Sequence, residues 1–221
     1  MPGQLFSDAS LRNARRVYVD RIDAGERLAA HVMLSGRRPE LLLGLSPGGL
    51  HVALGLARAL NLPFSHFLVL EIESYLARGP PLGYLTPTGR RFVKQELVAS
   101  LGLDEGALAR LTGHALARLQ ELGATKPRPE LRGLSVLLVE EALANPEPLR
   151  LAAEEARLLG AKEVGIGAPT GHERTVEALR ASFDYLICPL LSDEAPYSPE
   201  DSYIIWYEIT FREGLKALRM A

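Results

Sequence analysis

The order of apolar and polar positions predicts alternating helices and strands along most of the chain. Apolar side chains recur at helical spacing over residues 20–34, and residues 41–45 form a short apolar run. A Ser-Pro-Gly-Gly turn and a helix ending at Leu60 follow, and a second apolar run at 67–72 predicts the next strand. We expect the two strands to be parallel, with the helices covering the faces of the sheet.

The same alternation returns in the C-terminal half of the chain. The pattern there predicts three strands separated by two helices, at 135–140, 148–159, 163–168, 173–182 and 184–190. An aromatic, β-prone stretch at 203–207 and a closing helix follow. Together the elements predict an α/β fold with a doubly wound, mainly parallel five-stranded sheet and helices on both faces.

Residues 73–130 interrupt this alternation. Helical periodicity predicts helices at 91–101 and 104–122, and a Lys-Pro-Arg-Pro linker at 126–129 leads back to the sheet. This stretch is predicted to be a helical insertion or cap region.

The length of the chain bounds the number of domains. Its 221 residues suffice for one well-buried core, and two independent cores would be small. We therefore expect a single domain over 1–221, with the insertion or cap at 73–130 and a C-terminal tail at 191–221.

Composition and charge argue against several classes of partner. The formal net charge of −2 provides no electrostatic footprint for nucleic acid or an anionic membrane surface. No apolar run approaches the length of a membrane span, and the polar start does not resemble a signal peptide. The single cysteine, Cys188, lies in an apolar run and is predicted to be a buried core residue. We expect a cytoplasmic protein that binds neither nucleic acid nor a membrane.

Two adjacent carboxylates, Glu140 and Glu141, end the strand predicted at 135–140. In an α/β fold, ligands bind at the carboxyl ends of strands, close to the start of the next helix. Acidic side chains at this place are poorly suited to packing, so they predict contact with hydroxyls, a metal or a cationic group. A solvated strand end is the structural alternative.

The chain resembles the type I phosphoribosyltransferases at several such places, above all the stand-alone predicted phosphoribosyltransferases of bacteria. The matching segments are 20–25 with 28–29, 43–45 ahead of Gly48 and Gly49, 139–141, Ala168 with Pro169, and the tyrosine-rich tail. The resemblance covers most of the chain from about Asp20 onward. It implies transfer of ribose 5-phosphate from phosphoribosyl pyrophosphate to a nitrogen base, with Mg²⁺ as the cofactor.

In that family the acidic pair binds ribose hydroxyls, so the resemblance places Glu140 and Glu141 at the ribose position. The loop that follows holds the 5′-phosphate with backbone N–H groups at a helix N-terminus. The residues of this loop here are Asn145, Pro146, Glu147 and Pro148. Each proline removes an N–H donor, and Glu147 adds a negative charge where the phosphate would lie. The resemblance therefore predicts a degenerate phosphate loop.

Two other positions differ from the family in the same direction. The pyrophosphate loop of relatives reads Pro-Arg-Gly-Gly, whereas Ser46, Pro47, Gly48 and Gly49 lack the arginine. Relatives end the second strand with a lysine, and Glu71 is predicted to hold that place. Three anion-binding elements have thus lost positive charge or N–H donors, which argues against binding phosphoribosyl pyrophosphate in the usual manner.

We therefore expect a phosphoribosyltransferase-like protein with a diverged, catalytically impaired site that acts in ligand binding, regulation or assembly. The expected partners are a small-molecule or nucleotide-like ligand and a second copy in a homodimer. No catalytic residue and no resident metal are assigned. The alternative is an active enzyme that uses Mg²⁺ and handles phosphates through Arg90, Arg91 or Lys94.

A serine hydrolase is a weaker alternative. Residues 44–48 fit the Gly-x-Ser-x-Gly pattern with Ser46 as nucleophile, but the next residue should donate an oxyanion-hole N–H and Pro47 has none. His172 is interpreted as a surface residue at a helix entry rather than a base. The aromatic side chains at 203–207 are interpreted as packing groups, with a hood over a base as the alternative.

Overall fold

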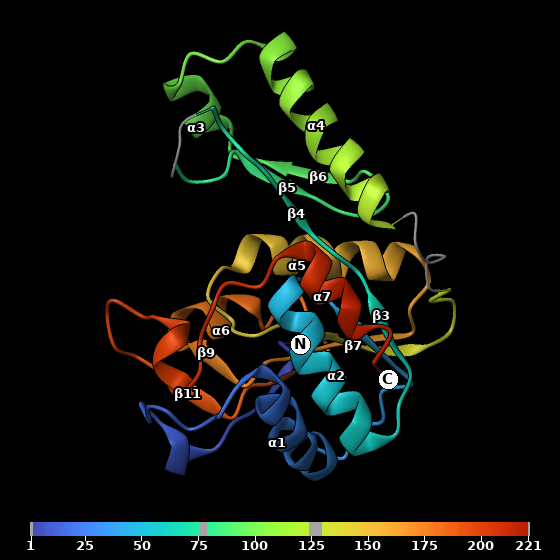
Figure 1. Cartoon of the computed structure of the whole chain (residues 1–221), viewed down its shortest axis with the longest axis vertical. Helices are drawn as coiled ribbons and strands as arrows, with labels where there is room; N and C mark the ends of the chain where they lie inside the picture. Colours follow the sequence, from blue (N-terminus) through green and yellow to red (C-terminus); the bar gives the residue numbers. More distant parts are fainter. Residues whose placement is uncertain (1, 76–78, 124–129, 221) are drawn as a thin grey trace.

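A six-stranded parallel sheet forms the core of this computed structural model, which describes residues 2–75, 79–123 and 130–220 (Figure 1). The strand order is β1-β10-β8-β7-β2-β3. The strands are β1 (Gln4–Phe6), β2 (Leu41–Gly44), β3 (Phe64–His66), β7 (Ser135–Val139), β8 (Glu163–Gly167) and β10 (Tyr185–Ile187). The predicted α/β fold with a mainly parallel sheet is confirmed. It has one strand more than predicted, because the three residues of β1 carry too little pattern to be recognised.

Alternate side chains of the central strand β7 contribute to two separate cores. Leu137 and Val139 pack with helices α1 and α2, whereas Val136 and Leu138 pack with α5 and α6. These helices are α1 (Arg21–Leu34), α2 (Pro47–Leu60), α5 (Pro146–Leu158) and α6 (Glu173–Leu179). The predicted placement of helices on both faces is therefore confirmed, and it follows from the period of two along a strand.

Helix α2 begins earlier than the sequence pattern suggested. Ser46 is its N-cap and accepts a hydrogen bond from the N–H of Gly49, and Pro47 occupies the first position, where no N–H is needed. The predicted Ser-Pro-Gly-Gly turn is therefore wrong, because these residues form the cap and first turn of the helix.

The second parallel strand also lies earlier than predicted. It is β3, and only the end of the apolar run predicted at 67–72 forms another strand, in a different sheet. That antiparallel sheet consists of β4 (Leu70–Ile72), β5 (Gly83–Leu85) and β6 (Arg91–Val93). Phe67 and Leu68 between β3 and β4 are buried, so the apolar pattern gives no sign that the chain passes from one sheet to another here.

The antiparallel sheet and the helices α3 (Gln95–Ser100) and α4 (Glu105–Gly123) form a small unit, drawn in green above the core in Figure 1. The unit has its own apolar cluster, which includes Ile72, Leu82 and Leu111. The helix predicted at 104–122 is confirmed. The one predicted at 91–101 starts too early, because its first residues pair with β5 as β6. The linker predicted at 126–129 lies outside the described residues, and the division of the chain at 73–130 stays a prediction.

The C-terminal part adds a short parallel pair to the core. The predicted strand 184–190 is divided between β10 and β11 (Leu190–Ser192), and β11 pairs with β9 (Thr170–His172). The remaining elements are the 3₁₀ turns Ala9–Leu11 and Pro199–Ser202 and the helix α7 (Phe211–Ala217). The aromatic stretch 203–207 makes one isolated bridge, from Tyr203 to Tyr18, so the prediction of a β-prone segment is wrong beyond that residue. The closing helix is confirmed.

Two further predictions concern single features. Cys188 is fully buried in the core, as predicted. Over the described residues, every helix is too short or too polar to span a membrane.

Helices α1 and α2 pack with their backbones in direct contact. A Cβ atom at Gly25 would lie 2.0 Å from the carbonyl oxygen of Val52, and one at Gly55 would lie 2.1 Å from the carbonyl oxygen of Ile22. Both glycines are therefore required by the close approach of the helices, even though glycine weakens a helix interior.

We predict that Gly55→Ala lowers the free energy of unfolding by about 1–3 kcal/mol, because the added methyl group forces the two helices apart. Gly113→Ala in α4 is the matched control, since a Cβ there would meet nothing within 4 Å. The control should stabilise the protein by up to about 1 kcal/mol through helix propensity. Urea unfolding followed by circular dichroism measures both, and equal effects of the two substitutions would contradict the prediction.

Candidate functional site

The acidic pair lies where the carboxyl ends of β2 and β7 meet. The two strands are neighbours in the sheet, so the residues after Gly44 and after Val139 emerge at the same edge. The hydroxyl of Ser46 donates a hydrogen bond of 2.7 Å to Oε2 of Glu140. The structure thus brings the predicted ribose position and the predicted pyrophosphate loop together.

Glu140 is partly buried and bound by the protein itself. Its Oε2 atom also accepts a hydrogen bond from the N–H of Glu141, at 3.0 Å. Burial, and then the neighbouring carboxylate of Glu141, raise the pKa of Glu140 to about 8, although the hydrogen bonds from Ser46 and the N–H of Glu141 act in the opposite direction. Glu140 is therefore mostly protonated at neutral pH.

Glu141 forms an ion pair with Nε of Arg21, whose side chain is only 5% exposed. Its carboxylate lies against Gly48, where a Cβ atom would be only 1.9 Å from Oε2. The glycine thus leaves the space that this carboxylate fills at the first turn of α2. The carboxylate of Glu141 therefore contacts the protein itself, with Arg21 as its counter-ion.

Aromatic side chains of the C-terminal tail surround Arg21. Its guanidinium carbon lies 3.9 Å from the ring centroid of Trp206, and the rings of Tyr203 and Tyr207 are 5.9 and 5.8 Å away. The hydroxyl of Tyr203 donates to the carbonyl oxygen of Glu141 at 2.8 Å. The predicted packing role is confirmed for Tyr203, which is buried, whereas Tyr207 is 54% exposed.

The residues predicted to form a degenerate phosphate loop lie at the start of helix α5. Asn145 is the N-cap, and Pro146 and Pro148 lie in the first turn, so the prediction that the helix begins at 148 is wrong. The N–H of Glu147 donates to Oδ1 of Asn145 at 3.3 Å. Prolines are well accommodated here because the first N–H groups of a helix have no partner within it.

Glu71 was predicted to end a parallel strand. It lies instead in the antiparallel strand β4, opposite Tyr84 of β5. The parallel strand β3 ends at His66. Burial, and then the charge of Glu73, raise the pKa of Glu71, while Lys94 acts in the opposite direction. The hydroxyl of Tyr84 accepts a hydrogen bond from Nδ2 of Asn145. The predicted position of Glu71 is therefore wrong. The small antiparallel unit contacts the start of α5 through Tyr84 instead.

The three cations considered for phosphate contact differ in their surroundings. Arg90 forms a 2.6 Å ion pair with Glu154 of α5, and Arg91 is exposed on β6. Lys94 is partly buried, with Nζ 5.4 Å from the ring centroid of Tyr84. Of the three, Lys94 therefore lies next to the side chain that contacts the start of α5.

The hydrolase and metal hypotheses gain no support from the geometry. The hydroxyl of Ser46 is engaged as a helix cap and as a donor to Glu140. His172 is the N-cap residue of α6, and its ring packs against Tyr197 at a centroid distance of 5.6 Å. Over residues 2–75, 79–123 and 130–220, no group of three His, Cys, Asp or Glu side chains is arranged to hold a metal ion.

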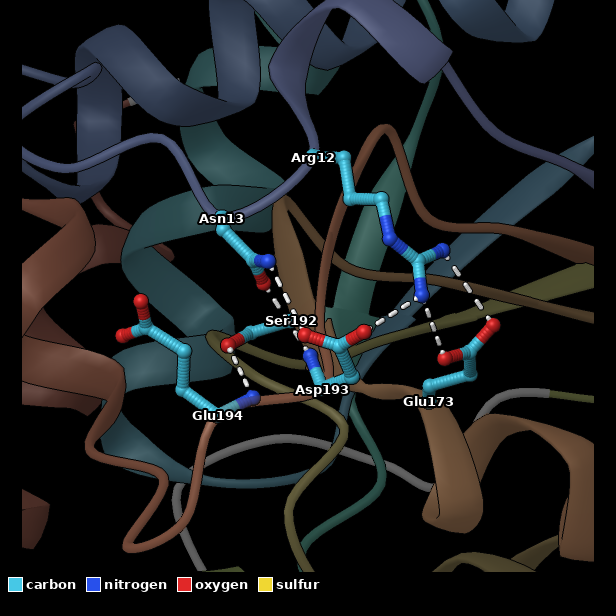
Figure 2. A network of polar contacts seen from close by, with 6 residues as sticks. All are labelled: Arg12, Asn13, Glu173, Ser192, Asp193 and Glu194. Atoms are coloured by element: carbon cyan, nitrogen blue, oxygen red, sulfur yellow. Dashed lines mark hydrogen bonds and ion pairs between the residues drawn. The ribbon is translucent and has the colours of Figure 1, made fainter.

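A second polar network joins the N-terminal segment to α6 and to the residues after β11 (Figure 2). Arg12 forms ion pairs with Glu173 and Asp193 at 2.8 and 2.7 Å, and Asn13 donates to Asp193 at 2.9 Å. Hydrogen bonds from Arg12 and Asn13 lower the pKa of Asp193. These side chains are solvent-exposed, so the network ties chain segments together and adds little stability.

Comparison with known proteins gives relatives for this chain. No family model matches it. It is 25% identical over 177 residues to "Putative phosphoribosyl transferase Rv0571c" and to "Putative phosphoribosyl transferase MT0597", from two strains of Mycobacterium tuberculosis. The resemblance to phosphoribosyltransferases is confirmed. The match covers 78% of this chain and only 40% of the length of these relatives.

A solved structure shows the same fold. The structure of TT1426 from Thermus thermophilus superposes with a TM-score of 0.71 at 21% sequence identity, and covers 91% of this chain and 97% of that one. At this identity the likeness concerns the fold and not the activity.

Sequence reasoning missed Arg21 and Tyr84 as parts of the site. Arg21 carried a signal, because a cation in the first turn of a helix is disfavoured by the helix dipole and needs a partner elsewhere. Tyr84 carried none, since its contact with Asn145 joins two segments that are 61 residues apart.

We predict that Glu140→Gln stabilises the protein increasingly as the pH rises from about 4.5 to about 8. In this range the unfolded chain loses its proton from Glu140 while the folded protein keeps it, so the wild type loses stability that the amide variant retains. The difference should reach about 5 kcal/mol, because each unit of pKa difference between the folded and unfolded states corresponds to about 1.4 kcal/mol. Glu26→Gln, on the exposed face of α1, is the control and should change stability by less than about 0.5 kcal/mol. Urea unfolding at several pH values measures the effect, and a difference independent of pH would refute it.

Proposed function

We propose that this protein is a phosphoribosyltransferase-like protein whose site does not bind phosphoribosyl pyrophosphate in the usual manner. It binds a small, hydroxyl-bearing ligand with less negative charge, and acts in regulation or assembly rather than in transfer. The observation that carries the proposal is the first turn of α5, where two of the first three residues are prolines and the N–H of the other, Glu147, is bonded to Asn145.

The N–H groups at the start of α5 support this proposal. Pro146 and Pro148 have no N–H, and the N–H of Glu147 is taken up by Asn145. A helix N-terminus binds anions through such N–H groups and through its dipole, so the first three residues of α5 offer a phosphate only the dipole. The carboxylate of Glu147 in the same turn opposes even that attraction.

The charges around the strand ends support the same conclusion. Glu141 already carries a negative charge at the first turn of α2, and Arg21 is committed to it. Because the ion pair neutralises both groups, no net positive charge remains there to attract a phosphate.

The acidic pair is also a poor fit for Mg²⁺. Glu140 is mostly protonated at neutral pH and is held by Ser46, and Glu141 is paired with Arg21. Mg²⁺ prefers ionised carboxylates together with substrate phosphates. We therefore assign no step to a metal ion.

Lys94 favours a second candidate function, that of an active phosphoribosyltransferase. Its ammonium group lies over the ring of Tyr84, whose hydroxyl contacts Asn145 at the start of α5. In this alternative Lys94 replaces the missing N–H donors with a positive charge.

Isothermal titration with phosphoribosyl pyrophosphate and Mg²⁺ tests the proposal. We predict no binding in the micromolar range for the wild type, and a Kd in that range would overturn the proposal in favour of the active enzyme. The triple variant Pro146→Gly, Glu147→Thr and Pro148→Ala restores two N–H donors and removes one negative charge. It should bind ribose 5-phosphate at least about tenfold more tightly than the wild type.

Pro199→Gly with Glu200→Thr provides the matched control. This Pro-Glu pair starts a 3₁₀ turn in the tail, so the substitution changes the same residue types and the same charge away from α5. The control should leave the affinity for ribose 5-phosphate unchanged. An equal gain in both variants would show that net charge, and not the start of α5, limits phosphate binding.

A further inference from the structure

The carboxylate of Glu141 occupies the place at the start of α2 where a free anion would be attracted. Helix α2 has 14 residues, and its first turn lies at the carboxyl ends of β2 and β7. The Glu141 carboxylate lies directly on Gly48, so this first turn is covered by a negative group of the protein itself.

Arg21 provides the positive charge for this arrangement. It is almost completely buried, and its ion pair with Glu141 uses Nε. The N–H groups of Nη1 and Nη2 make no hydrogen bond to the residues that the structure describes. A buried guanidinium with unused donors beside a helix N-terminus has the chemistry of an anion-binding group.

The C-terminal tail closes over the same place. Trp206 stacks on Arg21, and the hydroxyl of Tyr203 bonds to the carbonyl of Glu141. Helix α7 packs against the start of α2, because a Cβ atom at Gly214 would lie 2.7 Å from the Cα of Pro47. The tail therefore holds Arg21 and Glu141 together and fixes the first turn of α2 beneath them.

We infer that Glu141 determines the specificity of this site by acting as a built-in anion. Its carboxylate fills the anion position formed by Arg21 and the first turn of α2, so the site rejects oligophosphates and admits uncharged ligands. This inference rests on the proposed function and names the residue that excludes the anion at the α2 side of the site.

A gain in the affinity for an inorganic anion tests this inference. Glu141→Gln removes the negative charge but keeps an oxygen that can accept the hydrogen bond from Arg21. Titration with inorganic pyrophosphate should show binding at least about tenfold tighter than that of the wild type. Trp206 is the only tryptophan in the chain, so its fluorescence reports both the folded state and the occupation of Arg21.

Glu26→Gln is the matched control for this test. It makes the same chemical change on the exposed face of α1, at a residue that has no ion pair with Arg21. The control should bind pyrophosphate no better than the wild type. An equal gain in both variants, or none in Glu141→Gln, would overturn the inference.

A second variant keeps the test decisive if Glu141→Gln does not fold. Glu141→Asp retains a counter-ion for Arg21, but its shorter side chain withdraws the carboxylate from Gly48. A smaller gain in pyrophosphate affinity is expected, and an unchanged affinity would overturn the inference. Tight binding of phosphoribosyl pyrophosphate by the wild type would instead refute the proposed function, so the two failures are distinguishable.

Discussion

The ion pair between Arg21 and Glu141 connects the three parts of the chain that build the site. Arg21 opens α1, Glu141 follows β7, and Trp206 of the tail stacks on the guanidinium. A buried charge without its partner is costly, so each of these segments depends on the other two for its position. The direct backbone contact at Gly25 and Gly55 fixes α1 against α2, and the pair thereby lies over the first turn of α2.

The start of α5 shows how one set of residues serves stability and limits ligand binding. Asn145 is among the best N-caps, and proline suits the first turn because its backbone angle is already helical. The same features remove the N–H groups that an anion needs. The result is a rigid helix start with few N–H groups available, which is poorly suited to binding a phosphate.

The small antiparallel unit is attached to the core through α5. The N–H of Thr88 donates to Oε1 of the buried Glu155 at 3.1 Å, and Arg90 pairs with Glu154. Tyr84 adds the contact with Asn145 at the beginning of the helix. Helix α5 therefore contacts this unit, and it begins shortly after the acidic pair in the chain.

Local pattern was enough to determine much of this protein. The continuous apolar run of β7 and the helical spacing of apolar residues in α1 and α4 identify these elements, because a central strand is buried on both faces and these helices on one. The acidic pair, the prolines at 146 and 148, and Gly48 were recognisable because each changes the chemistry of a known position in the fold. The sequence alone therefore indicated the α/β class and the place of the acidic pair at the end of a strand.

Only the tertiary structure decided how these residues are used. The apolar run at 67–72 passes from one sheet to another without a change in pattern, so the place of Glu71 depended on strand pairing. Whether Glu140 and Glu141 face a ligand or the protein depended on Arg21 and Ser46, which lie 120 and 94 residues away in the sequence. Contacts of this kind arise from packing between distant segments, and no local periodicity records them. The sequence by itself determined the elements and their chemistry, and the fold decided that the acid at 141 binds Arg21 of its own chain.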